Sequence, residues 1–324
     1  MSSFKSIGGY FGLHTSASNP YYSDLLALNS GRNALEYILL SRNYKKIYLP
    51  FFTCDVLLEP FKKHAVEYEF YKIDFNLEPV QLPELKKNEA FLYTNYFGLK
   101  SNYINQLIDK LDNLILDYAQ AFFCQPLKGV DTFYSPRKFF GIPDGAYVST
   151  DAVYELPLNK DSSVDRFSHL LIRIEEGAEA GYEVFKKNDN SLIGAPIREM
   201  SNLTKSLLGD IDYNWAKERR NRNFNFLHQH LKEYNQFEWL NQLQIDGPLV
   251  YPFYSFDEGL RAYLIKYKIF VATYWPNVLV WTEEDSIEYQ LTNNVVYLPI
   301  DHRYNEEDMR QIINTIYNYY GFSN

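Results

Sequence analysis

The sequence predicts an α/β fold: a mostly parallel central sheet flanked by helices, followed by a smaller C-terminal α+β lobe. From residue 31 to about 150, short apolar segments alternate with helical segments, which is typical of parallel strands joined by crossover helices. Beyond residue 205, a long charged helix precedes a mixture of short strands and helices. We therefore expect a large α/β domain over residues 1–205 and a small domain over residues 206–324.

The elements of the large domain follow from the spacing of its apolar residues. Helices are expected at residues 32–43, 54–64 and 102–111, where apolar side chains recur with helical spacing. Strands are expected at residues 46–52, 66–74, 90–97 and 114–118, which are short and rich in β-formers or alternate in polarity. The acidic stretch at residues 175–181 indicates an exposed turn or short helix.

The small domain is expected to begin with a charged amphipathic helix over residues 215–234. It continues with predicted strands at residues 249–254, 270–274 and 294–298 and predicted helices at residues 258–267 and 306–319. In parallel sheets, ligands bind beyond the carboxyl ends of the strands. Functional residues are therefore expected directly after the strands of the large domain.

Composition excludes several classes of protein. The 324 residues carry a net charge of −9 without a cluster of four basic residues, so we expect no nucleic-acid partner. No uncharged apolar run approaches the about 18 residues that cross a bilayer, and the first ten residues contain no apolar signal-peptide core. Two cysteines cannot form a disulfide framework or a cysteine-based zinc site. The cytoplasm is the expected compartment, with no membrane partner.

Two polar features adjoin predicted elements of the sheet. Ser30 and Gly31 precede the first helix, where free backbone N–H groups at the positive end of the helix dipole suit a phosphate. The alternative is ordinary N-capping by Ser30. Asp117 lies at the end of the apolar strand 114–118. A carboxylate is costly to bury there without a cation or a protonated nitrogen, unless it only caps a helix at the rim of the sheet.

Lys138 lies among aromatic residues, directly before Phe139 and Phe140 and three residues after Ser135. Desolvation there would favour a neutral, nucleophilic amine, whereas the alternative is a lysine that extends past the rings into solvent. A phosphate site, a strand-end acid and a Ser-x-x-Lys segment follow one another along the chain. Together they supply the anion-binding amides, the carboxylate and the amine that pyridoxal phosphate requires.

Short segments in a fixed order extend this pattern through most of the chain. They are Ser30 to Leu35, Leu49 to Cys54, Asn95 to Gly98, Asp117 to Ala121, Ser135 to Lys138, Asp144 to Ala146 and Leu298 to Ile300. In these segments the chain resembles the DegT-type sugar aminotransferase family, whose members are pyridoxal-phosphate-dependent enzymes of fold type I. The resemblance implies the same fold and the same cofactor.

The resemblance also implies roles for individual residues. Lys138 would be the Schiff-base lysine, and Asp117 the partner of the pyridine nitrogen. Gln120 would lie near the ring hydroxyl of the cofactor. Residues around the phosphate would be Ser30, Gly31, Arg32 through its amide, and Ser135. Cys54 stands where the family often has an aromatic residue on the cofactor ring, and Tyr96 is the alternative stacking residue.

The implied activity is transfer of an amino group from glutamate or glutamine to a nucleotide-linked keto sugar, for surface polysaccharide or another glycoconjugate. The implied assembly is a homodimer with its active site between the large lobe and the partner chain. In the small lobe, Tyr274 and Trp275 are candidate contacts for the acceptor, unless they only form lobe core. Arg198 and Arg219 are candidate counter-charges for a sugar-nucleotide diphosphate.

Other functions remain open from the sequence. The Ser-x-x-Lys segment also fits penicillin-binding serine enzymes, but no Lys-Thr-Gly strand follows it. His228 and His230 are two apart on a predicted helix and so point in different directions, which argues against a metal site. A non-catalytic regulatory or structural homodimer with the same fold is a second alternative. A pyridoxal-phosphate-dependent sugar dehydratase is a third, although such enzymes commonly replace the lysine by histidine.

Overall fold

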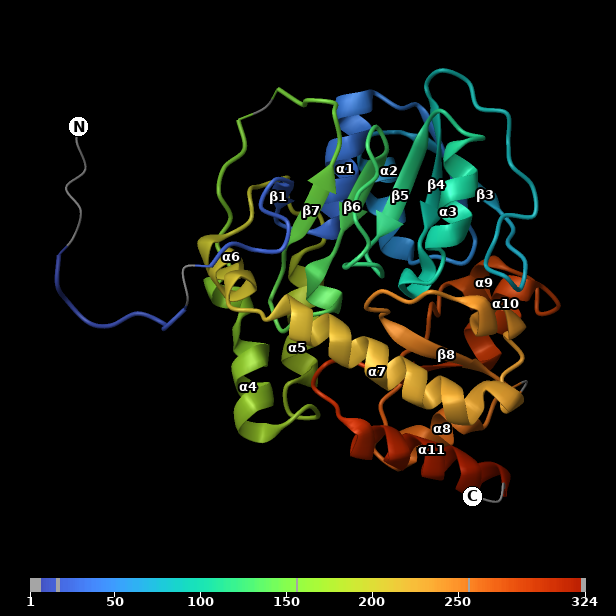
Figure 1. Ribbon diagram of the computed structural model, residues 1–324. Helices are drawn as coiled ribbons and strands as arrows, with labels where there is room; N and C mark the ends of the chain where they lie inside the picture. Colours follow the sequence, from blue (N-terminus) through green and yellow to red (C-terminus); the bar gives the residue numbers. More distant parts are fainter. Residues whose placement is uncertain (1–6, 16–17, 156, 256, 322–324) are drawn as a thin grey trace.

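The protein contains a seven-stranded sheet with helices on both faces and a separate two-stranded sheet (Figure 1). The computed structural model describes residues 7–15, 18–155, 157–255 and 257–321. The large sheet consists of β1 Leu26–Leu28, β2 Lys46–Pro50, β3 Glu67–Tyr71, β4 Glu89–Thr94, β5 Leu114–Tyr118, β6 Asp131–Tyr134 and β7 Ala146–Ser149.

Five strands of the large sheet are parallel. The spatial order is β1-β7-β6-β5-β4-β2-β3, and the pairs from β3 through β2, β4 and β5 to β6 are all parallel. Only the β6–β7 and β7–β1 pairs are antiparallel. The prediction of a mostly parallel sheet is therefore confirmed, and the carboxyl ends of β4, β5 and β6 lie side by side at one edge.

Each face of the sheet has its own apolar core. Helices α1 Gly31–Arg42 and α2 Leu58–Lys63 cover one face, and α3 Ser101–Ile108 packs on the other. Side chains of β4 alternate between the two: Phe91 and Tyr93 belong to the core with α3, whereas Ala90 and Leu92 belong to the core with α1 and α2. Burial on both faces explains why this strand is almost continuously apolar.

A smaller lobe follows the long helix α7 Tyr213–Leu231 (Figure 1). In this lobe β8 Val250–Tyr254 and β9 Val295–Pro299 pair antiparallel, accompanied by α8 Leu260–Lys266, α9 Val278–Trp281, α10 Ile287–Asn294 and α11 Glu306–Tyr320. Among the hydrogen bonds that join it to the large lobe, two connect to the loops that follow β2 and β3. Asn277 Nδ2 donates to the Thr53 carbonyl over 2.9 Å, and the Ile73 amide donates to the Glu288 carboxylate over 2.7 Å.

Most predicted elements are present within a few residues of their expected bounds. The predicted strand at residues 270–274 is wrong: only Ala272 forms an isolated bridge, to Tyr297 of β9. This segment adds side chains to the core but does not form a ladder with a neighbouring strand. Its apolar sequence alone therefore led to a wrong strand prediction. The sequence did not predict the short strands β1 and β7 or the helices α4 Ser168–Glu176, α5 Tyr182–Ser191, α6 Asn202–Gly209, α9 and α10.

The expected boundary between residues 205 and 206 falls inside α6, and the division into two domains stays a prediction. Within the described ranges, no helix combines the length and the apolarity that a membrane crossing requires.

The large sheet is tied to α1 by a buried ion pair that predicts a stability effect. Asp131, 2% exposed at the start of β6, accepts hydrogen bonds from Arg42 Nε and from the Thr150 hydroxyl over 2.9 and 2.7 Å. Arg42→Ala should lower the free energy of unfolding by about 2–3 kcal/mol, because it leaves the carboxylate buried without its cation. Urea denaturation followed by circular dichroism measures this loss.

The matched control is Arg310→Ala, which removes the exposed pair with Glu306 on α11. It should cost no more than about 0.5 kcal/mol. Equal losses in the two variants would contradict the importance assigned to the buried pair.

Candidate active site

Asp117 is buried at the carboxyl end of β5, in the middle of the large sheet. Its side chain is 6% exposed, and one carboxylate oxygen accepts a hydrogen bond from the Ala119 amide over 2.8 Å. No ion pair joins this carboxylate to a described residue. Burial raises the pKa of Asp117, and the nearby positive charge of Lys138 lowers it in part. Asp117 is thus a buried acid that still lacks a close cationic partner.

Lys138 follows β6 in a short 3-10 turn, Pro136–Lys138. The turn directs Phe139 and Phe140 into the core while the Lys138 side chain is exposed, so the protein alone does not provide the aromatic enclosure that the sequence suggested. Burial raises the pKa of the Cys54 thiol and of the Asp117 carboxyl, and the Lys138 ammonium lowers both. β5 and β6 are adjacent parallel strands, so Lys138 and Asp117 lie at the same edge of the sheet, within electrostatic range of each other.

Ser135 contacts the N-terminus of α1. A Cβ atom built on Gly31 would lie 3.6 Å from Ser135 Cβ and 3.7 Å from its hydroxyl oxygen. Ser30 is the N-cap, with its hydroxyl 3.2 Å from the Asn33 amide. The first-turn amides of Gly31 and Arg32 have no carbonyl partner within the helix, as at any helix N-terminus. The structure thus shows that Ser30 caps α1, and the anion site at this helix start stays a prediction.

Gln120 lies in the turn after β5 and is 1% exposed. Its side-chain oxygen accepts a hydrogen bond from the Phe97 amide over 3.1 Å. Its Nε2 is buried and has no hydrogen-bond partner among the described residues. A buried amide without an acceptor is costly, so this nitrogen is poised to donate to a ligand beside Asp117.

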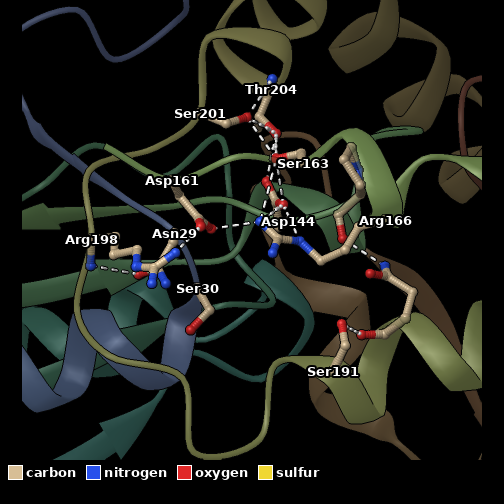
Figure 2. A network of polar contacts seen from close by, with 12 residues as sticks. Asn29, Ser30, Asp144, Asp161, Ser163, Arg166, Ser191, Arg198, Ser201 and Thr204 are labelled. Carbon is tan, nitrogen blue, oxygen red and sulfur yellow. Dashed lines mark hydrogen bonds and ion pairs between the residues drawn. The ribbon is translucent and has the colours of Figure 1, made fainter. Parts of the chain in front are cut away.

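A polar network fixes the chain that follows Lys138 (Figure 2). Asp144 is 1% exposed and accepts hydrogen bonds from the Ser163 hydroxyl and Arg166 Nε over 2.6 and 2.8 Å. Gly145 beside it has a φ of +105°, and a Cβ there would lie 2.9 Å from Thr204 Cγ2, so only glycine fits. The Gly145 amide also donates to the Asn29 carbonyl over 2.8 Å. The network therefore joins the Lys138 loop to the start of α1.

The predicted aromatic residues differ in exposure. Tyr96 and Trp275 are buried, and both contact Phe52, whose carbonyl accepts the Tyr96 hydroxyl over 3.0 Å. Tyr274 is half-buried, with its ring 5.6 Å from that of Phe97. Trp275 is thus part of the contact between the lobes, while Tyr274 keeps an accessible surface next to the residue that binds Gln120.

Three predicted arginines occupy different environments. Arg32 Nε lies 3.2 Å from Glu59 on α2. Arg198 lies beside the α1 N-terminus, where its guanidinium is 3.1 Å from Asp161 (Figure 2). Arg219, half-buried on α7, lies over the Trp215 ring at 6.0 Å. The structure therefore places Arg198 at the candidate site, and no contact of the described residues joins Arg219 to Lys138 or Asp117.

Arg220 was missed by the sequence reasoning and supports the lysine loop directly. It is 1% exposed, and it donates to the Phe139 carbonyl over 3.2 Å and to the Pro248 and Leu249 carbonyls over 3.1 and 3.2 Å. Desolvation lowers its pKa to about 10. Its helical spacing from the buried residues Ala216, Phe224 and Leu227 could have identified it.

The two histidines of α7 have separate partners. His228 Nδ1 lies 3.2 Å from the Tyr251 hydroxyl, and His230 Nδ1 lies 2.8 Å from the Phe226 carbonyl. In the described part of the chain, no three His, Cys, Asp or Glu side chains gather as a metal site would require.

The buried guanidinium of Arg220 predicts a second stability effect. Arg220→Met should lower the free energy of unfolding by about 3 kcal/mol or more, since it leaves three inward carbonyls without a donor. Arg219→Met, on the same helix, removes only a half-buried contact with Trp215 and should cost less than about 1 kcal/mol. Thermal and urea unfolding of the two variants test this difference, and a similar cost for both would refute it.

Comparisons with known proteins identify the fold. No family model and no curated protein matches the sequence. Among solved structures, the chain is similar to a DegT DnrJ EryC1 StrS aminotransferase from Brucella abortus (17% identity, TM-score 0.61, 92% of this chain and 86% of that one). It is also similar to PseC from Helicobacter pylori, an aminotransferase involved in pseudoaminic acid biosynthesis (14%, 0.63, 90% and 85%).

A third similar structure is GDP-4-keto-6-deoxy-D-mannose-3-dehydratase from E. coli with bound hydrated PLP (13% identity, TM-score 0.61, 90% of this chain and 86% of that one). The likeness extends over both lobes in all three cases. The fold expected from the resemblance is thereby confirmed: the chain has the fold that these sugar aminotransferases share with the dehydratase.

Proposed function

We propose that the protein is a pyridoxal-phosphate-dependent aminotransferase that transfers an amino group from glutamate or glutamine to a nucleotide-linked keto sugar. The observation that carries this proposal is the pair formed by Lys138 and Asp117. An exposed amine lies at the same edge of the sheet as a buried carboxylate whose pKa burial raises, and a carboxylate in that environment requires a positively charged partner.

The residues around this pair fit the cofactor. The first-turn amides of α1 and the Ser135 hydroxyl would hold the phosphate. The buried Nε2 of Gln120 lacks an acceptor among the described residues, and the ring hydroxyl would supply one. Asp117 would pair with the pyridine nitrogen. The proposed neighbours of the ring are Tyr96 and Cys54. Cys54 is half-buried and lies within electrostatic range of Lys138.

The chemistry assigned to the chain is acid–base chemistry. When bound, pyridoxal phosphate supplies an aldehyde that condenses with amines and a ring that delocalises the electrons left after proton removal. Lys138 would hold the cofactor covalently and, once displaced by the donor, move a proton between the α-carbon of the donor and the C4′ carbon of the cofactor. Asp117 would keep the ring nitrogen protonated, so that the negative charge developing on carbon is stabilised.

The acceptor assignment rests on the sugar enzymes of the same fold, including a structure solved with a TDP-sugar product. We assign Tyr274 to the sugar or base, because its half-buried ring adjoins Phe97. Arg198 beside the α1 N-terminus and Arg219 are the proposed counter-charges for the diphosphate. The product would enter surface polysaccharide or a related glycoconjugate.

The proposed assembly is a homodimer in the cytoplasm. The Lys138 side chain is exposed at the carboxyl edge of the sheet, and a partner chain over this edge would exclude water from the reaction. Both cysteines are free, which fits a reducing compartment. The same fold is found in a dehydratase, but the lysine at position 138 favours amino transfer over dehydration and over a non-catalytic role.

The cofactor proposal predicts a colour and a covalent label. The purified protein supplied with pyridoxal phosphate should turn yellow, and borohydride should fix the mass of the cofactor on the peptide that contains Lys138. Lys138→Ala should abolish the label, whereas Lys128→Ala, at an exposed lysine, should leave it unchanged. A colourless wild-type protein that takes up no cofactor would refute the proposal.

Glutamate should bleach the yellow protein, and a non-catalytic regulator would keep its colour.

Asp117→Asn separates the proposed role in chemistry from a role in stability. Because burial raises its pKa, the native state holds this proton more tightly than the unfolded state, and Asp117 destabilises the fold as the pH rises through the native pKa. The variant should therefore unfold at pH 8 with a free energy equal to or above that of the wild type. Bleaching by glutamate should slow by about 100-fold or more.

The Asp117→Asn prediction requires two measurements, the free energy of unfolding and the rate of bleaching by glutamate. Chemical denaturation of the cofactor-free protein at pH 5 and pH 8 gives the stability, and stopped-flow absorbance gives the bleaching rate. A destabilised variant with a normal bleaching rate would show that Asp117 is a structural residue only.

A further inference from the structure

The N-terminal segment over residues 7–13, which we call the arm, is apolar and lies away from the rest of the protein (Figure 1). Three of its four large side chains are almost fully accessible, Ile7 96%, Tyr10 98% and Phe11 101%, and Leu13 is 62% exposed. No hydrogen bond joins the arm to another residue that the structure describes. A cluster of exposed aromatic and aliphatic residues of this kind marks an interaction surface.

The chain that follows the arm is anchored beside the candidate active site. Tyr22 behind it is buried, and its hydroxyl donates to the Phe122 carbonyl over 2.5 Å, two residues after Gln120. The Tyr22 ring lies 4.7 Å from that of Tyr134, the residue before Ser135. These contacts fix Tyr22, nine residues after the arm, between the turn that carries Gln120 and the strand that leads to Lys138.

The helices α4 and α5, which we call the α4–α5 hairpin, form a second apolar surface without a cover. Only His169 of α4 and Asn188 of α5 are buried, while Leu171, Ile174 and Tyr182 are 50%, 79% and 56% exposed. Tyr182 also lines a groove of about 820 Å³ together with Ile265 and Phe270 of the small lobe. Amphipathic helices normally bury such an apolar face.

The hairpin adjoins the same site as the arm. Arg137, next to Lys138, lies 2.6 Å from Asp189 of α5, and its guanidinium lies over the Phe185 ring at 5.7 Å. In Figure 1 the arm and the hairpin lie on one side of the molecule, yet the arm extends away from the hairpin of its own chain. Both surfaces are therefore available to a second copy that approaches the open edge of the site.

We propose that the arm of one copy docks on the α4–α5 hairpin of a second copy, so that a homodimer exchanges two arms beside its two active sites. This proposal rests on the homodimer proposed above and names the surfaces that form it. The arm contains no charged residue, so apolar contact can drive docking between two chains of net charge −9. The same negative charge disfavours an anionic membrane as the occupant of these surfaces.

The size of the arm is adequate for this role. A buried aromatic side chain contributes about 150–250 Å², so Tyr10 and Phe11 from two exchanged arms would supply about 600–1,000 Å². A specific interface buries about 1,200–2,000 Å² in total. Arm exchange would thus provide a large share of the interface, and the hairpin and the rim of the site would provide the rest.

Site-specific cross-linking tests where the arm docks. Tyr10 is replaced by the photo-reactive p-benzoylphenylalanine in the full-length chain, which is irradiated as purified with no cofactor added. We expect a cross-linked dimer whose attachment maps by mass spectrometry to residues 168–191 of the other chain. The same probe at Tyr68, on the edge strand β3, should give no such product. Cross-links within one chain, to residues outside the hairpin, or to a different protein would each overturn the proposal.

Paired substitutions test the energetic contribution of the arm. Tyr10→Ser with Phe11→Ser should leave the circular dichroism of the chain unchanged, since both side chains are fully exposed, and should weaken the dimer by about 100-fold or more in sedimentation. Leu171→Ser with Ile174→Ser on the hairpin should do the same, and combining all four should add little. Val280→Ser, an 85% exposed control on α9, should leave dimerisation unchanged.

An unchanged dimer in both pairs would overturn the arm exchange. Borohydride labelling of Lys138 in the same variants reports on the cofactor proposal separately, so failure of one proposal is distinguishable from failure of the other.

Discussion

A buried carboxylate without a close cation is the constraint around which the rest of the site is arranged. Asp117 lies at the end of the central strand β5 and receives one backbone hydrogen bond. A parallel sheet brings the ends of β4 and β6 beside it, so the groups that surround this charge come from separate parts of the chain. The fold tolerates the cost because both apolar cores hold β5 in place and the Lys138 amine moderates the charge.

The exposed lysine is carried by a backbone that is fixed on both sides. Arg220 holds the Phe139 carbonyl from α7, and the network around Asp144 holds the next turn against the start of α1. Arg220 also binds the segment at Leu249, whose amide donates to the Phe97 carbonyl, while the Phe97 amide binds Gln120. The loops bearing Lys138 and Gln120 therefore share one support. Such preorganisation keeps reacting groups within the narrow geometry that proton transfer requires.

Sequence reasoning selected candidate site residues that the fold brings to one edge of the sheet, but it missed the residues that support their loops. Asp117 lies in a strand whose apolar run is easily recognised, whereas Ser135 and Lys138 follow β6, a short strand of mixed polarity. The parallel topology brings the three residues to one edge of the sheet. Arg220 and Asp144 act through backbone carbonyls and hydroxyls far away in sequence, and no local spacing reveals those partners. The segment at residues 270–274 was predicted as a strand because it is apolar. Its apolar residues serve core packing, and only Ala272 forms a bridge to another strand. The exposure of Lys138 depends on the turn after β6, which composition does not determine.

The candidate site is buried on the side of the sheet edge and open to solvent at Lys138. Asp117, Gln120 and Tyr96 are buried beneath the sheet edge, whereas Lys138 above them is exposed to solvent. Proton transfer at carbon is efficient only where water is excluded and charges interact in a low dielectric. In the proposed enzyme, a single chain would supply the base, the acid and the anion site but would leave Lys138 open to solvent. The α4–α5 hairpin contacts Arg137, the residue next to Lys138, so the proposed docking of a second copy's arm on this hairpin would help to exclude water from the opening.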